Sequence, residues 1–117
     1  VIPIMLEMEK RDFWKADAFL DKSHALIGQK KWDEARDAAL DGLALNPAGA
    51  VKAGLHMSLG EIAMNRKDFE SAAASFLRTA DLFIDDTQIK PRALRKAAEA
   101  LEANGEQARA QAIREQL

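Results

Sequence analysis

Hydrophobic and polar positions along the chain recur with helical spacing. Apolar residues three and four positions apart are separated by Lys, Glu, Arg and Gln, which is the period of an amphipathic helix. β-branched residues are few, and no stretch alternates Val, Ile, Thr and aromatic residues over the length of a strand. The pattern therefore predicts an all-α domain.

The helical pattern also repeats. Three segments each predict an amphipathic helix, a short polar turn and an alanine-rich second helix: "FLDKSHALIGQKKWDEARDAALDGLAL" (19–45), "HMSLGEIAMNRKDFESAAASFLRTADL" (56–82) and "LRKAAEALEANGEQARAQAIREQL" (94–117). The alanines that open the second helices, Ala35, Ala72 and Ala110, are 37 and 38 residues apart. A near-constant period of this length is typical of stacked helix pairs. We therefore expect about three antiparallel helix pairs.

The second helix of the first pair has an unusually small face. Ala35, Ala38, Ala39 and Gly42 are three and four positions apart and share that face. A smooth face lets the axis of a neighbouring helix come close, as ridges-into-grooves packing requires. Alanine is also simply a good helix former, but helix propensity does not explain why the small residues recur in step with the turns.

The later pairs repeat this arrangement of small and large side chains. Small residues in the same phase are Ala72, Ala73 and Ala80 on the second helix of the second pair, and Gly60 and Ala98 on first helices. Larger side chains are expected to fill the remaining spaces: Phe19, Leu26, Trp32, Leu43, Leu59, Phe69, Phe76 and Leu101.

Turn and capping residues give the boundaries. Pro47 and Gly49 predict the end of the first pair. Asp68 is a predicted N-cap before Phe69, and the dipeptide 104–105 (Asn-Gly) suits a helix C-cap. We interpret residues 13–117 as the helical repeat domain. Residues 1–12 form an N-terminal extension of the first helix or the remnant of a preceding repeat.

Particular residues in the three units resemble the tetratricopeptide repeat (TPR) family. The first unit carries Phe19, Ser23, Leu26, Trp32 followed by "DEA" (33–35), Gly42 and "LNP" (45–47); the second carries Leu59, Gly60, Ala63, Phe69, Ala72 and Phe76; the third carries Leu94, Ala98, Leu101, Gly105 and Ala110. The resemblance implies a right-handed solenoid of about three TPR-like helix pairs over 13–117.

The chain departs from the family pattern in three ways. Its period exceeds the family's usual length of about 34 residues, which predicts longer connections between pairs. The second unit has "IDDT" (84–87) in place of the closing proline, predicting a loop that ends near Pro91. The third unit has Arg114 where a large apolar residue is expected.

Candidate chemistry is sparse. The 117 residues include no cysteine and only two histidines, His24 and His56, which lie in different units. The sequence has no HExxH motif, no glycine-rich phosphate loop and no nucleophile elbow. His24 is interpreted as a polar residue facing a groove rather than as a metal ligand or base. We therefore expect no catalytic residue, cofactor or metal site, and no enzyme.

Two charged clusters are candidates for a calcium loop and for a nucleic-acid contact. Asp81, Asp85 and Asp86 lack EF-hand spacing, so they predict a solvated acidic turn rather than a calcium loop. A basic cluster, Arg92, Arg95 and Lys96, has no interleaved aromatic residue, which favours salt bridges or contact with an acidic peptide over nucleic acid.

Composition narrows the function classes further. The chain is 48% hydrophobic and 31% charged, with a net charge of −2, an ordinary globular mixture. This balance gives no global attraction to nucleic acid or to an acidic membrane surface. No apolar run approaches the roughly 20 residues that a membrane-spanning helix needs. We therefore expect neither nucleic-acid binding nor direct membrane insertion.

The family resemblance implies a binding surface. In TPR proteins the first helices line a concave groove that holds a peptide or a partner helix. The corresponding outward stripes here carry Asp17, Leu20, Asp21 and His24 in the first unit, Met57, Glu61 and Met64 in the second, and Arg92, Arg95, Glu99 and Glu102 in the third. This predicts a non-catalytic protein-interaction module; ordinary solvated helix faces are the alternative reading of the same residues.

Two further interpretations keep the fold and change the role. The chain could be an assembly or oligomerisation element of a larger multi-domain protein, covered by another domain or by a second copy in a homo-oligomer. Its long connections and its third unit resemble repeats in bacterial cell-envelope assembly factors. It could also be a regulatory domain fused to an enzyme whose catalytic residues lie outside this chain.

Overall fold

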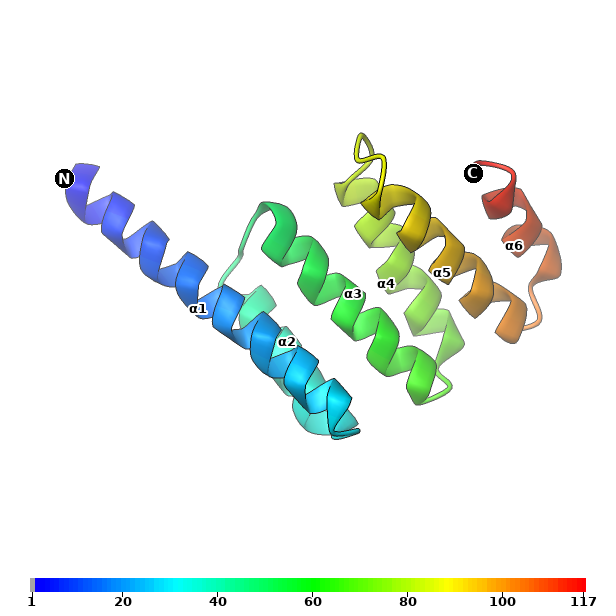
Figure 1. The fold of residues 1–117 in the computed structure, drawn as a ribbon, viewed down its shortest axis with the longest axis horizontal. Coiled ribbons are helices and arrows are strands. Elements are labelled where there is room, and N and C mark those ends of the chain that lie inside the picture. The colour runs from blue at the N-terminus through cyan, green and yellow to red at the C-terminus, as the bar shows by residue number, and fades with distance from the viewer. Residues whose placement is uncertain (1) are drawn as a thin grey trace. The chain divides into compact units, whose positions relative to one another are not determined.

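The protein is helical throughout the part of the chain that the structure describes. The computed structural model describes the backbone of residues 2–117 and the side chains of residues 14–117. The helices are α1 (Ile2–Gly28), α2 (Trp32–Ala44), α3 (Gly49–Asn65), α4 (Phe69–Leu82), α5 (Ile89–Ala103) and α6 (Gln107–Arg114) (Figure 1). Residues 2–117 contain no strand, so the all-α prediction is confirmed. Side chains of the predicted extension at 1–12 lie outside the described residues.

The chain divides into two units, residues 1–58 and residues 59–117. The division falls within α3, whose first part belongs to the first unit and whose last two turns belong to the second. Each unit is described by itself below.

In the first unit, α1 packs against α2. The predicted small face of α2 is buried, comprising Ala35, Ala38, Ala39 and Gly42. The buried Ser23 hydroxyl donates a hydrogen bond to the Ala35 carbonyl oxygen at 3.0 Å, which ties the two helices together. A Cβ on Gly42 would lie 2.9 Å from Leu55 Cδ2, so a side chain at this position would have to displace its neighbours. The small stripe therefore serves the close approach predicted for it.

In the second unit, α5 packs against both α4 and α6 (Figure 1). The predicted small residues Ala72, Ala73, Ala80, Ala98 and Gly60 are all buried. Of the larger side chains expected to fill spaces along the chain, Leu26, Phe76 and Leu101 are buried and the other five are half-buried. The core thus consists mainly of alanine faces with a few large residues between them.

The three turns within the helix pairs have the same backbone geometry. Each contains one residue in the left-handed region: Lys30, Lys67 and Gly105, with φ of 61°, 63° and 82°. The N–H of the next residue donates to the carbonyl five positions earlier, in the pairs Lys31–Leu26, Asp68–Ala63 and Glu106–Leu101, at 2.9, 2.9 and 2.8 Å. This is the Schellman arrangement that closes a helix C-terminus. The left-handed residues are 37 and 38 positions apart, so the backbone repeats with the period predicted from the alanines.

The predicted boundaries are confirmed at the caps. The Asp68 carboxylate accepts from the Ser71 N–H at 3.3 Å at the start of α4. Asn104 is the C-cap of α5, with left-handed Gly105 following it. Helix α2 ends at Ala44, shortly before Pro47.

The loop between α4 and α5 ends in an acidic cap. The Asp86 carboxylate accepts from the N–H groups of Ile89 and Gln88 at 2.7 and 2.8 Å. These bonds favour the charged form and lower the pKa of Asp86 below its ordinary value. Asp86 therefore anchors the start of α5, and predicted loop residue Pro91 lies inside the first turn of that helix.

Candidate binding hollow

The second unit contains a concave site between α3 and α5, over α4. We call it the Phe76 hollow. It encloses about 230 Å³ and is lined by Glu61, Met64 and Asn65 of α3, Phe76 of α4, and Lys96 and Glu99 of α5. The volume suits one side chain rather than a whole ligand of several groups.

The absence of a side chain at Gly60 determines where the floor of the hollow lies. Phe76 is only 1% exposed and packs on Gly60. A Cβ at residue 60 would lie 2.5 Å from Phe76 Cε1, which is well inside van der Waals contact. Glycine at residue 60 therefore allows the ring to lie against α3, and the ring edge and Met64 give the hollow an apolar base.

Lys96 spans the hollow with two weak contacts. Its Nζ lies 3.8 Å from Glu61 Oε1 and 5.8 Å from the centroid of the Phe76 ring, near the outer limit of a cation–π contact. Both charged side chains keep more than a third of their surface exposed. Such an exposed ion pair contributes at most about 1 kcal/mol, so Lys96 can leave this position at little cost.

The remaining polar groups at the rim are mostly hydrogen-bond acceptors. Asn65 Nδ2 donates to the Glu61 backbone carbonyl at 2.8 Å, which leaves the Asn65 Oδ1 available as an acceptor. Within the part of the chain that the structure describes, the Glu99 side chain has no hydrogen bond or ion pair. The lining of the hollow therefore carries two carboxylates and one ammonium, a net charge of −1.

Three of the predicted groove residues converge on this hollow: Glu61, Met64 and Glu99. Two others on α5, Arg92 and Arg95, are exposed and do not line it. Glu102 turns to α6 and forms an ion pair with Arg114. Arg114 therefore makes a part-exposed ion pair between α5 and α6.

The other predicted groove residues belong to the first unit. On α1, Asp17 is half-buried while Asp21 and His24 are exposed; Met57 on α3 is half-buried. Leu20 is half-buried and packs over Gly54, where a Cβ would lie 2.8 Å from Leu20 Cδ2. Leu20 therefore contributes to helix packing within its unit.

Sequence reasoning did not assign three lining residues to the site: Asn65, Phe76 and Lys96. Phe76 was expected only as a core residue, and Lys96 only as part of a basic cluster. A signal for Lys96 was present, because it lies three positions before Glu99 and shares its helix face. The sequence signal for Phe76 was glycine at residue 60. This signal could not be interpreted from the sequence, because the contact of Gly60 with the Phe76 ring depends on how α3 packs against α4.

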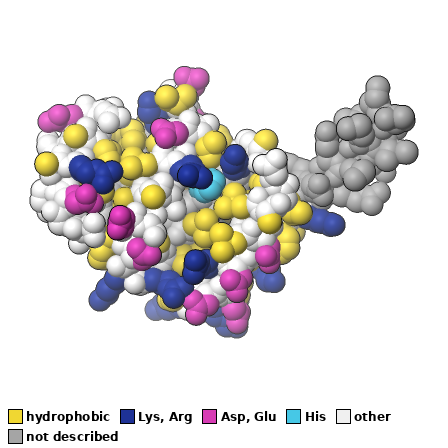
Figure 2. Space-filling model, turned by 180° about the vertical axis from the view of Figure 1, so that it is seen from behind, with side chains coloured by type: hydrophobic (Ala, Val, Ile, Leu, Met, Phe, Trp, Pro, Cys, Tyr) yellow, Lys and Arg dark blue, Asp and Glu magenta, His cyan; other side chains and the backbone are white. Residues whose placement is uncertain are grey.

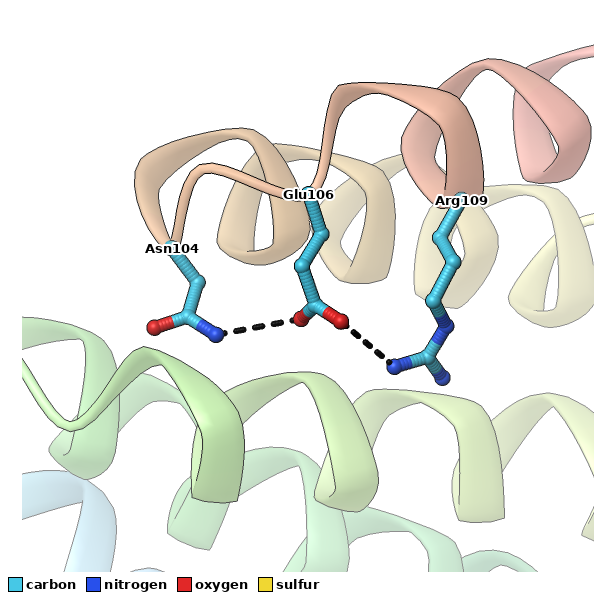
Figure 3. Close-up of polar contacts among 3 residues, drawn as sticks. All are labelled: Asn104, Glu106 and Arg109. Atoms are coloured by element: carbon cyan, nitrogen blue, oxygen red, sulfur yellow. Dashed lines mark hydrogen bonds and ion pairs between the residues drawn. The ribbon is translucent and has the colours of Figure 1, made fainter.

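A second polar cluster lies at the turn between α5 and α6 (Figure 3). The Glu106 carboxylate accepts from Asn104 Nδ2 at 3.0 Å and from an Arg109 guanidinium nitrogen at 3.1 Å. The Asn104 bond and then the Arg109 bond lower the pKa of Glu106 below its ordinary value. Asn104 and Glu106 belong to the turn between α5 and α6, and Arg109 lies in the first turn of α6. The cluster therefore holds the turn against the start of α6.

Charges of both signs occur on the face of the molecule that is drawn in Figure 2. On the face drawn in Figure 2, acidic, basic and hydrophobic side chains are interspersed over the described part of the molecule. Among the described residues no three His, Cys, Asp or Glu side chains gather as metal ligands. No described helix combines the length and the apolar character needed to cross a bilayer.

Comparison with known proteins adds no relative. The chain matches no protein-family model, no curated protein and no solved structure.

Proposed function

We propose that this chain is a non-catalytic protein-interaction module whose Phe76 hollow receives a side chain of a partner segment. One observation carries the proposal: a concave apolar floor, made by Phe76 and Met64, is surrounded by charged and amide groups. Protein interfaces concentrate binding energy where an anchor side chain enters such a pocket and a polar rim surrounds it.

We further propose that the helix pairs form a right-handed, TPR-like solenoid. Support comes from the three matching turns, whose left-handed residues recur at 37 and 38 positions, and from the buried alanine that follows each turn by five residues. In this arrangement the first helices are α1, α3 and α5. Their outward residues, including Asp17, Asp21, His24, Met57, Arg92 and Arg95, would extend the binding surface beyond the hollow.

Filling the hollow tests the function. Asn65 is exposed at the end of α3, so Asn65→Trp should place an indole over the cavity without disturbing the core. Gln111→Trp adds the same side chain at an exposed site on α6 and is the matched control. The unmodified chain and the control should capture partner proteins from native extract, and Asn65→Trp should capture less of them, as measured by quantitative mass spectrometry. The comparison requires that the three chains have equal Tm. Equal capture by all three chains would refute the role of the hollow.

A paired substitution tests the wider groove. Replacing Met57 and Glu61 together by alanine should weaken partner capture and leave thermal stability unchanged, because both side chains are only half-buried. A large fall in Tm would instead show that these two residues serve packing.

A second candidate function is assembly through an apolar surface. Leu82, the last residue of α4, is 41% exposed, and Ile84, in the following loop, is 59% exposed. Large exposed apolar side chains close together favour association. Light scattering over a range of concentrations tests this role: self-association should appear in the unmodified chain and decrease in Ile84→Ser. A monomer at the highest concentration would rule out a homo-oligomer under those conditions.

A further inference from the structure

We propose that the Phe76 hollow takes a lysine or arginine side chain of the partner. This inference rests on the interaction-module function proposed above and specifies the chemistry of the partner. It is drawn from the charges of the lining and from the position that Lys96 occupies.

The lining is complementary to a cation. Glu61 and Glu99 supply two carboxylates and Asn65 Oδ1 a neutral acceptor, whereas Lys96 is the one cation among the lining residues. Lys96 is already paired with Glu61, so the carboxylate left without a partner in the described structure is that of Glu99. An arriving ammonium or guanidinium would give Glu99 its first ion pair and would offset the negative charge of the two carboxylates.

Lys96 already shows how a cation sits in this place. Its ammonium lies over the Phe76 ring and near Glu61, the two kinds of group that attract a positive charge. Both contacts are long, at 5.8 and 3.8 Å, and the side chain is partly solvated. A partner cation approaching from outside could therefore displace Lys96 and make the same contacts at shorter range, while its methylene groups cover Met64.

An acidic partner fits the hollow less well. A carboxylate entering it would find one ammonium and would face both Glu61 and Glu99, and like charges placed together at an interface disfavour binding. The exposed Arg92 and Arg95 lie outside the lining and cannot compensate inside the cavity. Of the basic cluster on α5, only Lys96 therefore acts inside the hollow.

Three capped peptides provide the test. Each peptide has two leucines before and two leucines after a central residue. The central residue is arginine in one peptide, glutamine in the second and glutamate in the third. Each is titrated into the ¹⁵N-labelled full chain at low salt, and binding is followed by NMR. The arginine peptide should shift the amide signals of Glu61, Asn65, Lys96 and Glu99 and bind about fivefold more tightly than the glutamine peptide, the size expected of one exposed ion pair. The glutamate peptide should bind most weakly.

Two substitutions separate this mechanism from general charge effects. Glu99→Gln should remove most of the preference for arginine, whereas Glu115→Gln, which removes the same charge from an exposed site beyond α6, should leave it intact. Lys96→Met keeps the aliphatic stem and removes the internal cation. It should therefore tighten binding of the arginine peptide severalfold.

The outcomes distinguish the inference from the function on which it rests. Tighter binding of the glutamate peptide, or loss of arginine-peptide binding in Lys96→Met, would overturn the basic-partner inference. If those peptides still shifted the amide signals of the lining residues, the role of the hollow as a docking site would stand. Failure of the arginine peptide to shift any lining residue would also overturn the inference, and the Asn65→Trp capture experiment would then judge the proposed function separately.

Discussion

The Phe76 ring occupies the space that a side chain at Gly60 would need. A Cβ at residue 60 would lie 2.5 Å from Cε1 and 2.8 Å from both Cδ1 and Cζ of the ring. Phe76 is 1% exposed, so the ring has little freedom to move away. This contact joins α3 to α4 and sets the depth of the hollow between α3 and α5.

Gly60→Ala is therefore expected to destabilise the protein. Overpacking of a buried site costs roughly 1–3 kcal/mol, and the better helix propensity of alanine returns up to about 1 kcal/mol. The net effect should be a loss of about 1–2 kcal/mol in the free energy of unfolding, measured by urea denaturation.

Gly28→Ala is the control for this substitution. A Cβ at Gly28 meets nothing within 4 Å, and its position in the last turn of α1 makes a neutral or slightly stabilising change the expected result. Equal effects at residues 28 and 60 would contradict the close contact with Phe76.

Two buried serines should respond differently to alanine substitution. Ser23 Oγ donates to the Ala35 carbonyl across the α1–α2 interface, so Ser23→Ala should lose about 0.5–1.5 kcal/mol. Ser58 is equally buried, but among the described residues its Oγ has no hydrogen-bond partner. Ser58→Ala removes that unsatisfied hydroxyl and should be neutral or stabilising. Thermal unfolding of the two variants checks the prediction, and destabilisation of similar size at both sites would contradict it.

The repeat could be predicted from the sequence because its signals are local. Alanines at 35, 72 and 110 recur with the turns, and a helix turn is determined within a few residues of the chain. Asp68 was predictable as a cap for the same reason, since its partner Ser71 is three positions away.

The hollow could be predicted only in part. Glu61, Met64 and Glu99 were found because outward helical positions follow from periodicity. The contact of Lys96 with the Phe76 ring depends on how α4 and α5 pack, over a separation of 20 residues, and neither residue has a local signal for it. Neighbouring Arg95 has the same charge as Lys96 and remains outside the hollow, so residue type alone could not separate them.

The repeated turns make a prediction about glycine. Lys30 and Lys67 adopt left-handed backbone conformations, and the third turn places Gly105 at the same position. Left-handed geometry costs a side-chain-bearing residue roughly 1–2 kcal/mol, partly offset by the greater chain entropy of glycine in the unfolded state. Lys30→Gly and Lys67→Gly should each stabilise the protein by about 0.5–1 kcal/mol.

The reciprocal change completes the comparison. Gly105→Ala should destabilise by a similar amount, because nothing lies within 4 Å of an added Cβ and the left-handed φ of 82° is the remaining obstacle. Urea denaturation of all three variants tests whether the turns are energetically equivalent. Stabilisation by Gly105→Ala would contradict the assignment.

The Glu106 cluster predicts a specific dependence of stability on pH. Hydrogen bonds from Asn104 and Arg109 lower the pKa of Glu106 from its ordinary value of 4.5. A carboxyl group whose pKa is lower in the folded state stabilises the fold at pH values above the ordinary pKa, and this contribution disappears as pH falls through the folded-state pKa. The Tm of the unmodified protein should therefore exceed that of Glu106→Gln at about pH 7, and the difference should shrink below about pH 4.

Comparing these two chains isolates Glu106 from the other acidic groups. Asp86 also has a lowered pKa and loses its contribution in acid, but it is present in both proteins, so its effect cancels in the difference. Arg109→Gln removes one of the two partners of the carboxylate. In a protein that already carries Arg109→Gln, the further substitution Glu106→Gln should lower the Tm by less at about pH 7 than it does in the unmodified protein. A difference that stays constant down to about pH 3 would show that the glutamate acts through its shape and neutral hydrogen bonds rather than through its charge.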